Sequence, residues 1–448
     1  MKQASIIEKI RITGDLKLLS PLTISAGQSD GVIDSMVMRN GTGSAMIPGT
    51  SLAGVLRHIV ANSCSREDAE LLFGCLQAEG DSVPHQSLIT IDDVVLDGAE
   101  IVVRDGVAID SVTGTAIKAG KYDYEAVERG AAGKFQAELV IRRAQQENKE
   151  HIEALAKSIA DQLAYGISLG AHTAKGMGQA RVDNAVAAAY DFQQKNALSA
   201  WLLGKNAPAM YKAKPRAIMG AENFHMEIVL AIQSSLLVGA EPDMFQKETE
   251  AKLAKAMLRS KKDFVIPGTS VKGVVRKQAE RICRLAGSYP PEFLNNLMGY
   301  VDRHGTKRKS RLKTYEVYFK SGTVAKNQTH VRTDRFTGGH MDSGLYTYQP
   351  VWQEKQGAPV LHVAMDVEKC TAAEAGLMLM VLKDIWTGQA MFGGSKATGS
   401  GILQGIEASI AYNGSRWQLK QGSDGLRVSQ GDAGSLEALA AEFVKAGV

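Results

Sequence analysis

The chain contains one short element twice, and this repeat constrains the fold more than any other feature of the sequence. Residues 47–57 read IPGTSLAGVLR, and residues 266–276 read IPGTSVKGVVR. A long element that recurs within one chain indicates a duplicated structural unit. The sequence therefore predicts two copies of one domain.

Two further pairs of motifs follow the same order in both halves. Residues 110–114 (DSVTG) are matched by 334–338 (DRFTG), and the glycine run 170–178 (GAHTAKGMG) is matched by 393–401 (GGSKATGSG). The separation between the two members is nearly the same for all three pairs, so insertions between the copies are small. Three ordered pairs are poorly explained by coincidence.

The length of 448 residues agrees with this duplication, because single hydrophobic cores rarely serve much more than about 250 residues. We expect four segments: a first domain at 1–195, a linker at 196–220, a second domain at 221–412, and a C-terminal extension at 413–448. The repeat gives no role for the extension.

Composition excludes several classes of protein. No apolar run reaches the roughly 18 residues of a membrane span, and the N-terminus lacks the apolar core of a signal peptide, so we expect a cytoplasmic protein without a membrane partner. The four cysteines and nine histidines are scattered, with no paired spacing. A tightly held zinc ion is therefore not expected.

Positive charge is concentrated although the net charge is only +4. Ten lysines and arginines lie between residues 252 and 284, against two acids, Asp263 and Glu280. Such a concentration is typical of surfaces that bind polyanions, because neutralised phosphates release counterions. A solvated basic face would explain the charge alone equally well.

The order of predicted elements indicates an α+β fold. Apolar residues alternate over 12–18 as in a half-buried strand, and helical spacing of apolar residues begins at Leu52. Residues 149–165 and 372–386 are predicted to be the closing helices of the two copies. Strand and helix at the start, with helix and strand at the end, suit two modified ferredoxin-like (RRM-like) domains in tandem.

The repeated element is a candidate phosphate site. Ser51 and Ser270 are predicted N-caps, and Arg57, Lys272 and Arg276 follow within one or two turns. A helix N-terminus offers backbone N–H groups and the positive end of the helix dipole to a phosphate. The duplication favours this interpretation over simple capping.

The glycine runs are candidate RNA contacts, through Lys175, Gly176 and Gly178 in the first copy and Lys396 and Gly399 in the second. Glycines permit positive φ and close approach of backbone to a sugar-phosphate strand. Neither run matches a P-loop. A flexible hairpin is the alternative, and the two lysines argue against it.

Two acids, Asp30 and Asp34, lie in the glycine-rich loop before the first repeated element. A carboxylate beside a phosphodiester could hold Mg²⁺ or orient a 2′-hydroxyl for attack on phosphorus, although most loop aspartates simply form turns. The second copy has Asp243 and Asp263, and neither precedes its Ile-Pro-Gly by the same spacing as Asp34 does.

Together, the repeated element, the Asp-x-x-Thr-Gly motif and the glycine run resemble the RAMP superfamily of CRISPR-associated proteins. Each half looks like the backbone subunit of type III effector complexes, and two copies in one chain look like the tandem-fused subunit of subtype III-D. The resemblance implies RRM-like domains whose partners are CRISPR guide RNA, target RNA and other subunits of the complex.

The resemblance also implies a β-hairpin thumb in each copy that kinks the guide, near residues 118–135 and 341–360. It implies that Asp34, within residues 31–35 (GVIDS), matches the family's ribonuclease aspartate, and the second copy departs from that pattern. The implied activity is Mg²⁺-assisted cleavage of guide-paired target RNA by transesterification. Two alternatives are a structural guide-binding subunit without cleavage and an endoribonuclease that processes guide precursors.

Overall fold

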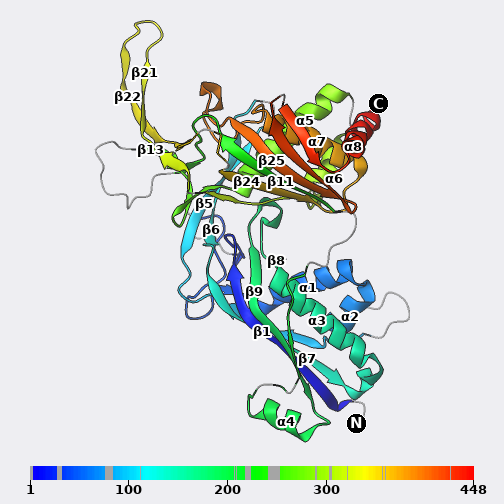
Figure 1. Cartoon of the computed structure of the whole chain (residues 1–448). Helices are drawn as coiled ribbons and strands as arrows, with labels where there is room; N and C mark the ends of the chain where they lie inside the picture. The colour runs from blue at the N-terminus through cyan, green and yellow to red at the C-terminus, as the bar shows by residue number, and fades with distance from the viewer. Residues whose placement is uncertain are drawn as a thin grey trace. The chain divides into compact units, whose positions relative to one another are not determined.

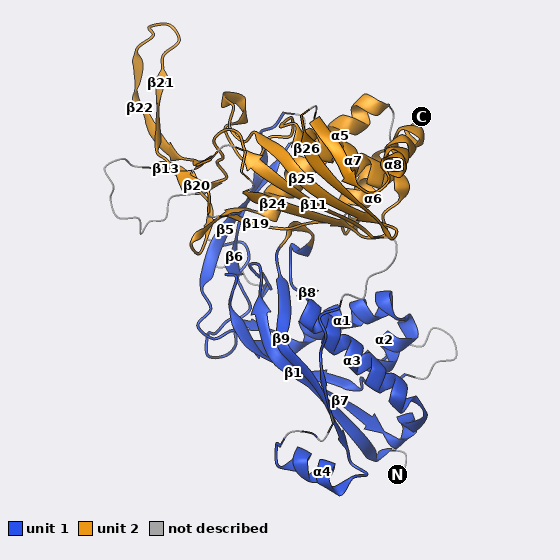
Figure 2. Cartoon of the chain, viewed as in Figure 1, with its two compact units in different colours: residues 1–173, 177–219 blue, residues 174–176, 220–448 orange. Residues whose placement is uncertain are grey.

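The computed structural model divides into two compact units, coloured separately in Figure 2. The first comprises Met1–Thr173 and Met177–Met219, and the second comprises Ala174–Gly176 and Gly220–Val448. The described residues are 4–27, 33–75, 84–110, 113–205, 207, 209–216, 223–240, 253–287, 290–301, 305–319, 321–355, 357–358, 360–423 and 425–447.

The first unit is built on β1 (Ile6–Leu18), which is long because apolar residues alternate along it and bury one side. The other strands are β2 (Met46–Ile47), β3 (Ile89–Ile91), β4 (Val94–Val95), β5 (Ile101–Ile109), β6 (Ala116–Val127), β7 (Ala132–Arg142), β8 (Ile167–Ser168), β9 (Gln179–Asp191) and β10 (Ala209–Lys212). The helices are α1 (Gly49–Ser63), α2 (Arg66–Phe73), α3 (Lys149–Tyr165) and α4 (Lys195–Leu202), with a short 3-10 turn η2 (Arg143–Asn148). A further 3-10 turn, η3 (Thr173–Lys175), begins in the first unit and continues into the short segment assigned to the second.

The main sheet of the first unit has the antiparallel order β10-β9-β1-β7-β3. Helices α1 and α3 cover it, as Figure 1 shows, and their apolar stripes share one core with the buried side of β1. Fully buried Ile12, Leu52 and Leu163 represent these three elements. The core therefore holds the repeated element, at the start of α1, against the sheet.

Residues 196–220, expected as a linker, fold within the first unit over much of their described length. Strand β10 pairs with β9 and closes that edge of the sheet. The Lys9 ammonium lies 4.1 Å from the ring centre of Trp201 on α4, and the Trp201 indole N–H donates to Glu138 at 3.3 Å. These contacts anchor α4, because an amphipathic indole finds both an apolar surface and an acceptor there.

The second unit repeats this plan around β11 (Phe224–Ile232). Its other strands are β12 (Gly239–Ala240), β13 (Leu253–Met257), β14 (Arg259–Ser260), β15 (Asp263–Ile266), β16 (Tyr300–Val301), β17 (Lys307–Arg308), β18 (Leu312–Thr314), β19 (Val317–Phe319), β20 (Thr323–Ala325), β21 (Gln328–Thr333), β22 (His340–Gln349), β23 (Val351–Gln353), β24 (Leu361–Val367), β25 (Leu403–Tyr412), β26 (Ser415–Gly422) and β27 (Gly425–Gln430). Its helices are α5 (Gly268–Ala286), α6 (Pro291–Met298), α7 (Ala372–Trp386) and α8 (Ala433–Ala446), with the 3-10 turn η4 (Lys396–Thr398). The main sheet has the order β18-β24-β11-β25-β26-β27.

The C-terminal extension is part of the second core. Strands β26 and β27 continue the main sheet, and α8 packs on α7 with Phe443 only 1% exposed. Gly376 on α7 makes this close approach possible, because a Cβ there would lie 2.2 Å from the carbonyl oxygen of Leu439. The extension therefore belongs to the fold of the second unit.

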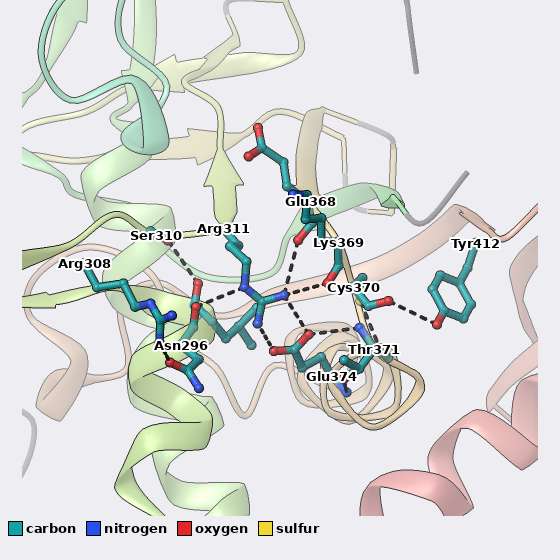
Figure 3. Close-up of polar contacts among 11 residues, drawn as sticks. Asn296, Arg308, Ser310, Arg311, Glu368, Lys369, Cys370, Thr371, Glu374 and Tyr412 are labelled. Atoms are coloured by element: carbon teal, nitrogen blue, oxygen red, sulfur yellow. Dashed lines mark hydrogen bonds and ion pairs between the residues drawn. The ribbon is translucent and has the colours of Figure 1, made fainter. Parts of the chain in front are cut away.

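An arginine ties α7 to the start of β18, as Figure 3 shows. The Arg311 guanidinium donates to both carboxylate oxygens of Glu374 and to the carbonyl oxygen of Lys369 at 2.7 Å. The Glu374 carboxylate is almost buried and also accepts from the Thr371 N–H at 3.0 Å, completing a capping box at the start of α7. A bidentate pair with this extra donor fixes the helix end firmly.

The α+β class predicted from the sequence is confirmed, and the antiparallel main sheets are consistent with two ferredoxin-like domains. The closing helices have the predicted bounds, as α3 and α7. In the part of the chain that the structure describes, no helix is long and apolar enough to cross a membrane.

Candidate nucleic-acid interface

The repeated element forms the first turns of α1 and α5, but its serines are not the N-caps. The N-caps are Pro48 and Pro267, and neither helix has a side-chain cap. The Pro48 carbonyl accepts from the Ser51 N–H at 2.9 Å, and Pro267 does the same for Ser270 at 2.9 Å. The capping prediction was wrong because proline, with its fixed φ, caps each helix three residues before the predicted serine.

A carboxylate occupies part of the α1 N-terminus. Asp93 accepts from the Gly49 N–H at 2.7 Å, where the helix dipole favours negative charge. A phosphate at this position would meet an acid that already uses the first backbone donor. The side of the helix, rather than its end, is the better candidate surface.

Both helices carry a glycine on that side that packing does not explain. Gly54 and Gly273, at the same position of the repeated element, are exposed, and a Cβ at either would meet no atom within 4 Å. Glycine within a helix costs about 1 kcal/mol relative to alanine. A glycine with free space above it, present in both copies, would let the backbone of a bound ligand approach the helix closely.

In the first unit a groove of about 360 Å³ runs beside this glycine. One wall is the side of α1, with Gly54 and the exposed Arg57, and the other is apolar, with Phe73 and Ile89. The sequence predicted Arg57 as an RNA contact, and the structure places its side chain at this groove. A guanidinium above an apolar wall suits a phosphate and its attached ribose or base.

The basic residues of α5 are held by the protein itself. The Arg276 guanidinium donates to Glu280 at 3.0 Å and to the Gly299 carbonyl at 3.2 Å. Lys272 is only 9% exposed, and its ammonium donates to the Leu312 carbonyl at 3.0 Å. Burial lowers the pKa of Lys272 to about 7. Lys272 thus points into the second unit, and its buried ammonium is not placed as an RNA contact would require.

The two glycine runs form the same closed loop. The Leu169 N–H donates to the Gly178 carbonyl at 2.8 Å, and the Phe392 N–H donates to the Gly401 carbonyl at 2.9 Å. Each closing glycine also donates to the segment after the first strand of its unit, to Pro21 and to Ser235, both at 2.7 Å. These loops are anchored at both ends, which the flexible-hairpin alternative did not anticipate.

The glycines within these loops have different roles. Gly178 has a φ of +71°, and a Cβ there would lie 1.8 Å from the Leu169 carbonyl oxygen, so it serves packing. Gly176 is also buried, with a φ of +85°. Gly399 is exposed, has a φ of +86° and faces open space. Of the three predicted glycine contacts, Gly399 has the surroundings of a ligand-facing residue.

The lysine of each glycine loop occupies a different position of its 3-10 turn in the two copies. The turn η3 reads Thr-Ala-Lys and ends with Lys175, whereas η4 reads Lys-Ala-Thr and begins with Lys396. Burial lowers the pKa of both lysines, and the ammonium of Lys277 on α5 lowers the pKa of Lys396 further. Lys396 and Lys277 therefore form a pair of neighbouring cations, which favours a bound anion.

The Asp-x-x-Thr-Gly motifs form the tips of two hairpins, β5–β6 and β21–β22. Asp334 accepts from the Thr337 N–H at 2.8 Å and the Phe336 N–H at 3.0 Å, and Asp110 accepts from the Thr113 N–H at 2.7 Å. These bonds lower the pKa of Asp334. The predicted thumbs, at 118–135 and 341–360, included only the second strand of each hairpin, because they placed the motif before the hairpin.

Asp34 is held against the first hairpin. Its carboxylate accepts from the Asp123 N–H at 2.9 Å, and its own N–H donates to the Asp123 carbonyl at 3.0 Å. Slightly further along, the Glu125 carboxylate accepts from the Val37 N–H at 2.9 Å and pairs with Arg39. The exposed Asp34 side chain is therefore fixed in orientation, as a group that positions a substrate must be. Asp30 lies outside the described residues.

The family model for the RAMP superfamily matches residues 15–181 and 219–404. The chain belongs to the RAMP superfamily. No curated protein matches it. RAMP membership carries a CRISPR-associated, RNA-binding role, with CRISPR RNA and an effector complex as the partners.

Strand pairing shows what replaces Asp34 in the second RAMP domain. Ser35 bridges Tyr124 on β6 in parallel, and Lys255 on β13 pairs in parallel with Tyr348 on β22. The separation between these two tyrosines equals that between the hairpin tips. The place of Asp34 thus falls at residues 253–254, Leu-Ala, where there is no carboxylate. Asp263 lies on β15 instead, and Asp243 is outside the described residues.

The acids near Asp34 do not enclose a metal site in the part of the chain that the structure describes. Asp105 and Asp123 are partners across the first hairpin, and Lys121 lies 3.5 Å from one carboxylate and 3.7 Å from the other. Among the described residues, no group of three or more acids, histidines or cysteines could hold a metal. Mg²⁺ commonly takes one or two carboxylates and completes its shell with water and phosphate, which Asp34 could satisfy with bound RNA.

Both RAMP domains carry an aromatic pair that the sequence predictions missed. Tyr122 and Tyr124 lie on β6, and Tyr346 and Tyr348 lie on β22, with ring centres 5.9 and 5.0 Å apart respectively. The signal was present, because the two pairs are offset from each other by the same distance along the chain as the hairpin tips.

Proposed function

We propose that this RAMP protein is the guide-binding backbone subunit of a type III CRISPR effector complex and that its first domain cuts the guide-paired target RNA. The observation that carries the proposal is the repeated helix side, with an open glycine at Gly54 and at Gly273, together with a glycine loop in each copy that the same backbone bond closes. Two such surfaces in one chain suit two successive steps along one RNA backbone. This agrees with a protein that contacts backbone and shape while base pairing supplies sequence specificity.

The proposed cleavage is a transesterification centred on Asp34. The 2′-oxygen of the target strand attacks the adjacent phosphorus, the bond from phosphorus to the 5′-oxygen breaks, and a 2′,3′-cyclic phosphate and a 5′-hydroxyl result. The Asp34 carboxylate, fixed by the Asp123 N–H, orients the attacking hydroxyl or contributes one ligand to Mg²⁺. When bound, Mg²⁺ would supply positive charge to the phosphate oxygens.

The test replaces Asp34 by alanine in the complete effector complex loaded with guide RNA. We expect target RNA to bind with unchanged affinity while one cut position per chain is lost, by about a hundredfold or more in rate. Asp15→Asn is the matched control, because Asp15 is a partly exposed acid of the same unit that pairs with Lys134. Unchanged cutting by Asp34→Ala would refute the catalytic role.

A purely structural subunit is the second candidate, and one contact favours it. The bond from the Asp123 N–H to Asp34 would stabilise this loop whether or not the chain cuts RNA. In that case Asp34→Ala should lower the midpoint of thermal unfolding of the isolated chain and leave every cut in place. The two candidates are therefore separated by measuring unfolding and cleavage on the same variant.

A further inference from the structure

The hairpin β21–β22 of the second unit has an aromatic cluster on one of its faces. His330 and Tyr346 are direct partners across the hairpin, with ring centres 5.2 Å apart and planes inclined by 19°. Tyr348, two residues along β22, lies on the same face, 5.0 Å from Tyr346 and 5.5 Å from His330. All three rings are only partly buried.

An arginine completes this face. The Arg332 guanidinium lies 5.6 Å from the ring centre of Tyr346. Arg332 passes over Gly344, whose added Cβ would come within 3.2 Å of the Arg332 Cβ. Arg332 itself is exposed. We call His330, Arg332, Tyr346 and Tyr348 the aromatic face.

In the first unit one of the two corresponding tyrosines is covered. Tyr124 is only 6% exposed and its hydroxyl donates to the Met177 sulfur at 3.6 Å, while the His172 ring lies 5.3 Å from it. In the second unit the histidine of the cluster comes from the hairpin itself. Tyr124 is thus buried in the first unit, whereas its counterpart Tyr348 is only partly buried in the second.

We propose that the aromatic face stacks unpaired nucleobases of single-stranded RNA, a site separate from the guide-backbone surfaces on α1 and α5. Ring faces beside a guanidinium suit bases of any sequence, because every base has a π face and its phosphate seeks a cation. The inference rests on the proposed function for the presence of RNA. Arg335, at the hairpin tip, adds a second exposed cation, which favours RNA over an apolar protein partner.

The experiment compares two fluorescent probes of equal charge on the full chain: a 12-nucleotide single-stranded RNA and the same backbone without bases. We expect the wild type to bind the RNA more tightly than the abasic strand. Replacing Tyr346 and Tyr348 together by leucine should reduce RNA affinity about tenfold, since each stacked base contributes on that order. Affinity for the abasic strand should stay the same.

Two control variants make the result specific. Tyr346→Phe with Tyr348→Phe keeps both rings and should bind RNA as the wild type does. Leu345→Ala removes a side chain that is 70% exposed on the opposite face and should also leave affinity unchanged. Circular dichroism checks that each variant folds.

Three outcomes would overturn the proposal. Equal binding of RNA and abasic strand by the wild type would show backbone recognition without stacking, and the proposed guide binding would survive. Wild-type RNA affinity in the double leucine variant would leave the aromatic face to a protein partner. Failure to bind either probe would refute RNA binding as a whole, and with it the proposed function.

Discussion

The two halves of this chain agree where an RNA backbone would lie and differ where chemistry would occur. Both have an open glycine on the first helix and a glycine loop closed by the same backbone bond. Among the residues that the structure describes, only the first has a carboxylate fixed against its hairpin, and only the second has an aromatic pair in which neither tyrosine is buried. A duplicated scaffold can therefore keep one function in both copies while each copy acquires its own side chains.

The largest expected effect concerns the acid that is present in one half. Asp34→Asn in the effector complex should slow one target cut per chain by about a hundredfold or more, because a neutral amide orients a hydroxyl and binds Mg²⁺ less well than a carboxylate. Asp263→Asn should change no cut, because Asp263 lies on β15 and not at the place of Asp34. Mapping the cleavage products of both variants on a labelled target measures this.

Two results would contradict the proposed difference between the halves. Loss of a cut in Asp263→Asn would show that the second domain cleaves with an acid in a different position. Equal loss of all cuts in Asp34→Asn would indicate a defect in assembly, which native gel analysis of the complex detects.

The next effect concerns what the halves share. Gly54→Ala and Gly273→Ala should each stabilise the chain by about 0.5–1 kcal/mol, because alanine favours the helix and its methyl group meets no atom. If the RNA backbone lies against these positions, the added methyl group should displace it. Both variants should then bind RNA about tenfold more weakly, which corresponds to about 1.4 kcal/mol. Unfolding and RNA titration on the same samples separate the two effects.

Gly434→Ala on α8 is the matched control. A Cβ there would meet its nearest atom, in Asp432, at 3.6 Å, so the variant should gain stability and bind RNA normally. Unchanged RNA binding by both Gly54→Ala and Gly273→Ala would remove the helix sides from the interface. An effect in one half alone would mean that the two units use their helices differently.

The sequence predicted the architecture well because the repeat and the apolar periodicities are local signals. They gave the α+β class and the bounds of α3 and α7. Prediction of site residues was weaker, because it depends on contacts that distant residues make. Lys272 reads as a surface cation in the basic segment, yet its burial and its bond to Leu312 depend on packing far along the chain.

The N-caps show a local limit of the same kind. Serine after glycine favours capping, but the Ile-Pro-Gly sequence starts the helix at the glycine and leaves the serine inside it. The hairpins were misplaced because a turn motif was taken as the beginning of the element instead of its tip. The tyrosine pairs could have been found, since their separation along the chain equals that of the hairpin tips.

A smaller effect separates the two arginines of the repeated element. Arg57→Gln should weaken RNA binding a few-fold and reduce the slope of log affinity against log salt by about one, as expected for a lost phosphate contact. Arg276→Gln should chiefly lower stability, because its guanidinium bonds to Glu280 and the Gly299 carbonyl. RNA affinity at several salt concentrations and thermal unfolding are measured on both variants. A loss of stability in Arg57→Gln and a loss of RNA affinity in Arg276→Gln would show that Arg276, and not Arg57, contacts the RNA.

The smallest effect concerns Lys272, whose counterpart in the first element is Ala53. Burial lowers the pKa of Lys272 to about 7, whereas an unfolded lysine has a pKa of about 10.4. Between these values the unfolded chain binds more protons than the folded chain, so the free energy of unfolding increases as pH rises from about 7 toward 10.

Lys272→Met should therefore raise the midpoint of thermal unfolding by a few degrees at about pH 6, and by progressively less as the pH approaches 10. The Leu312 carbonyl keeps the Ser310 hydroxyl as a donor at 2.8 Å, so the variant gives up only the longer bond to the Ala174 carbonyl, at 3.4 Å, without a replacement donor. RNA affinity should not change. A loss of RNA affinity, or a stability difference that is independent of pH, would return Lys272 to the RNA-binding surface and make the two repeated elements more alike than the structure indicates.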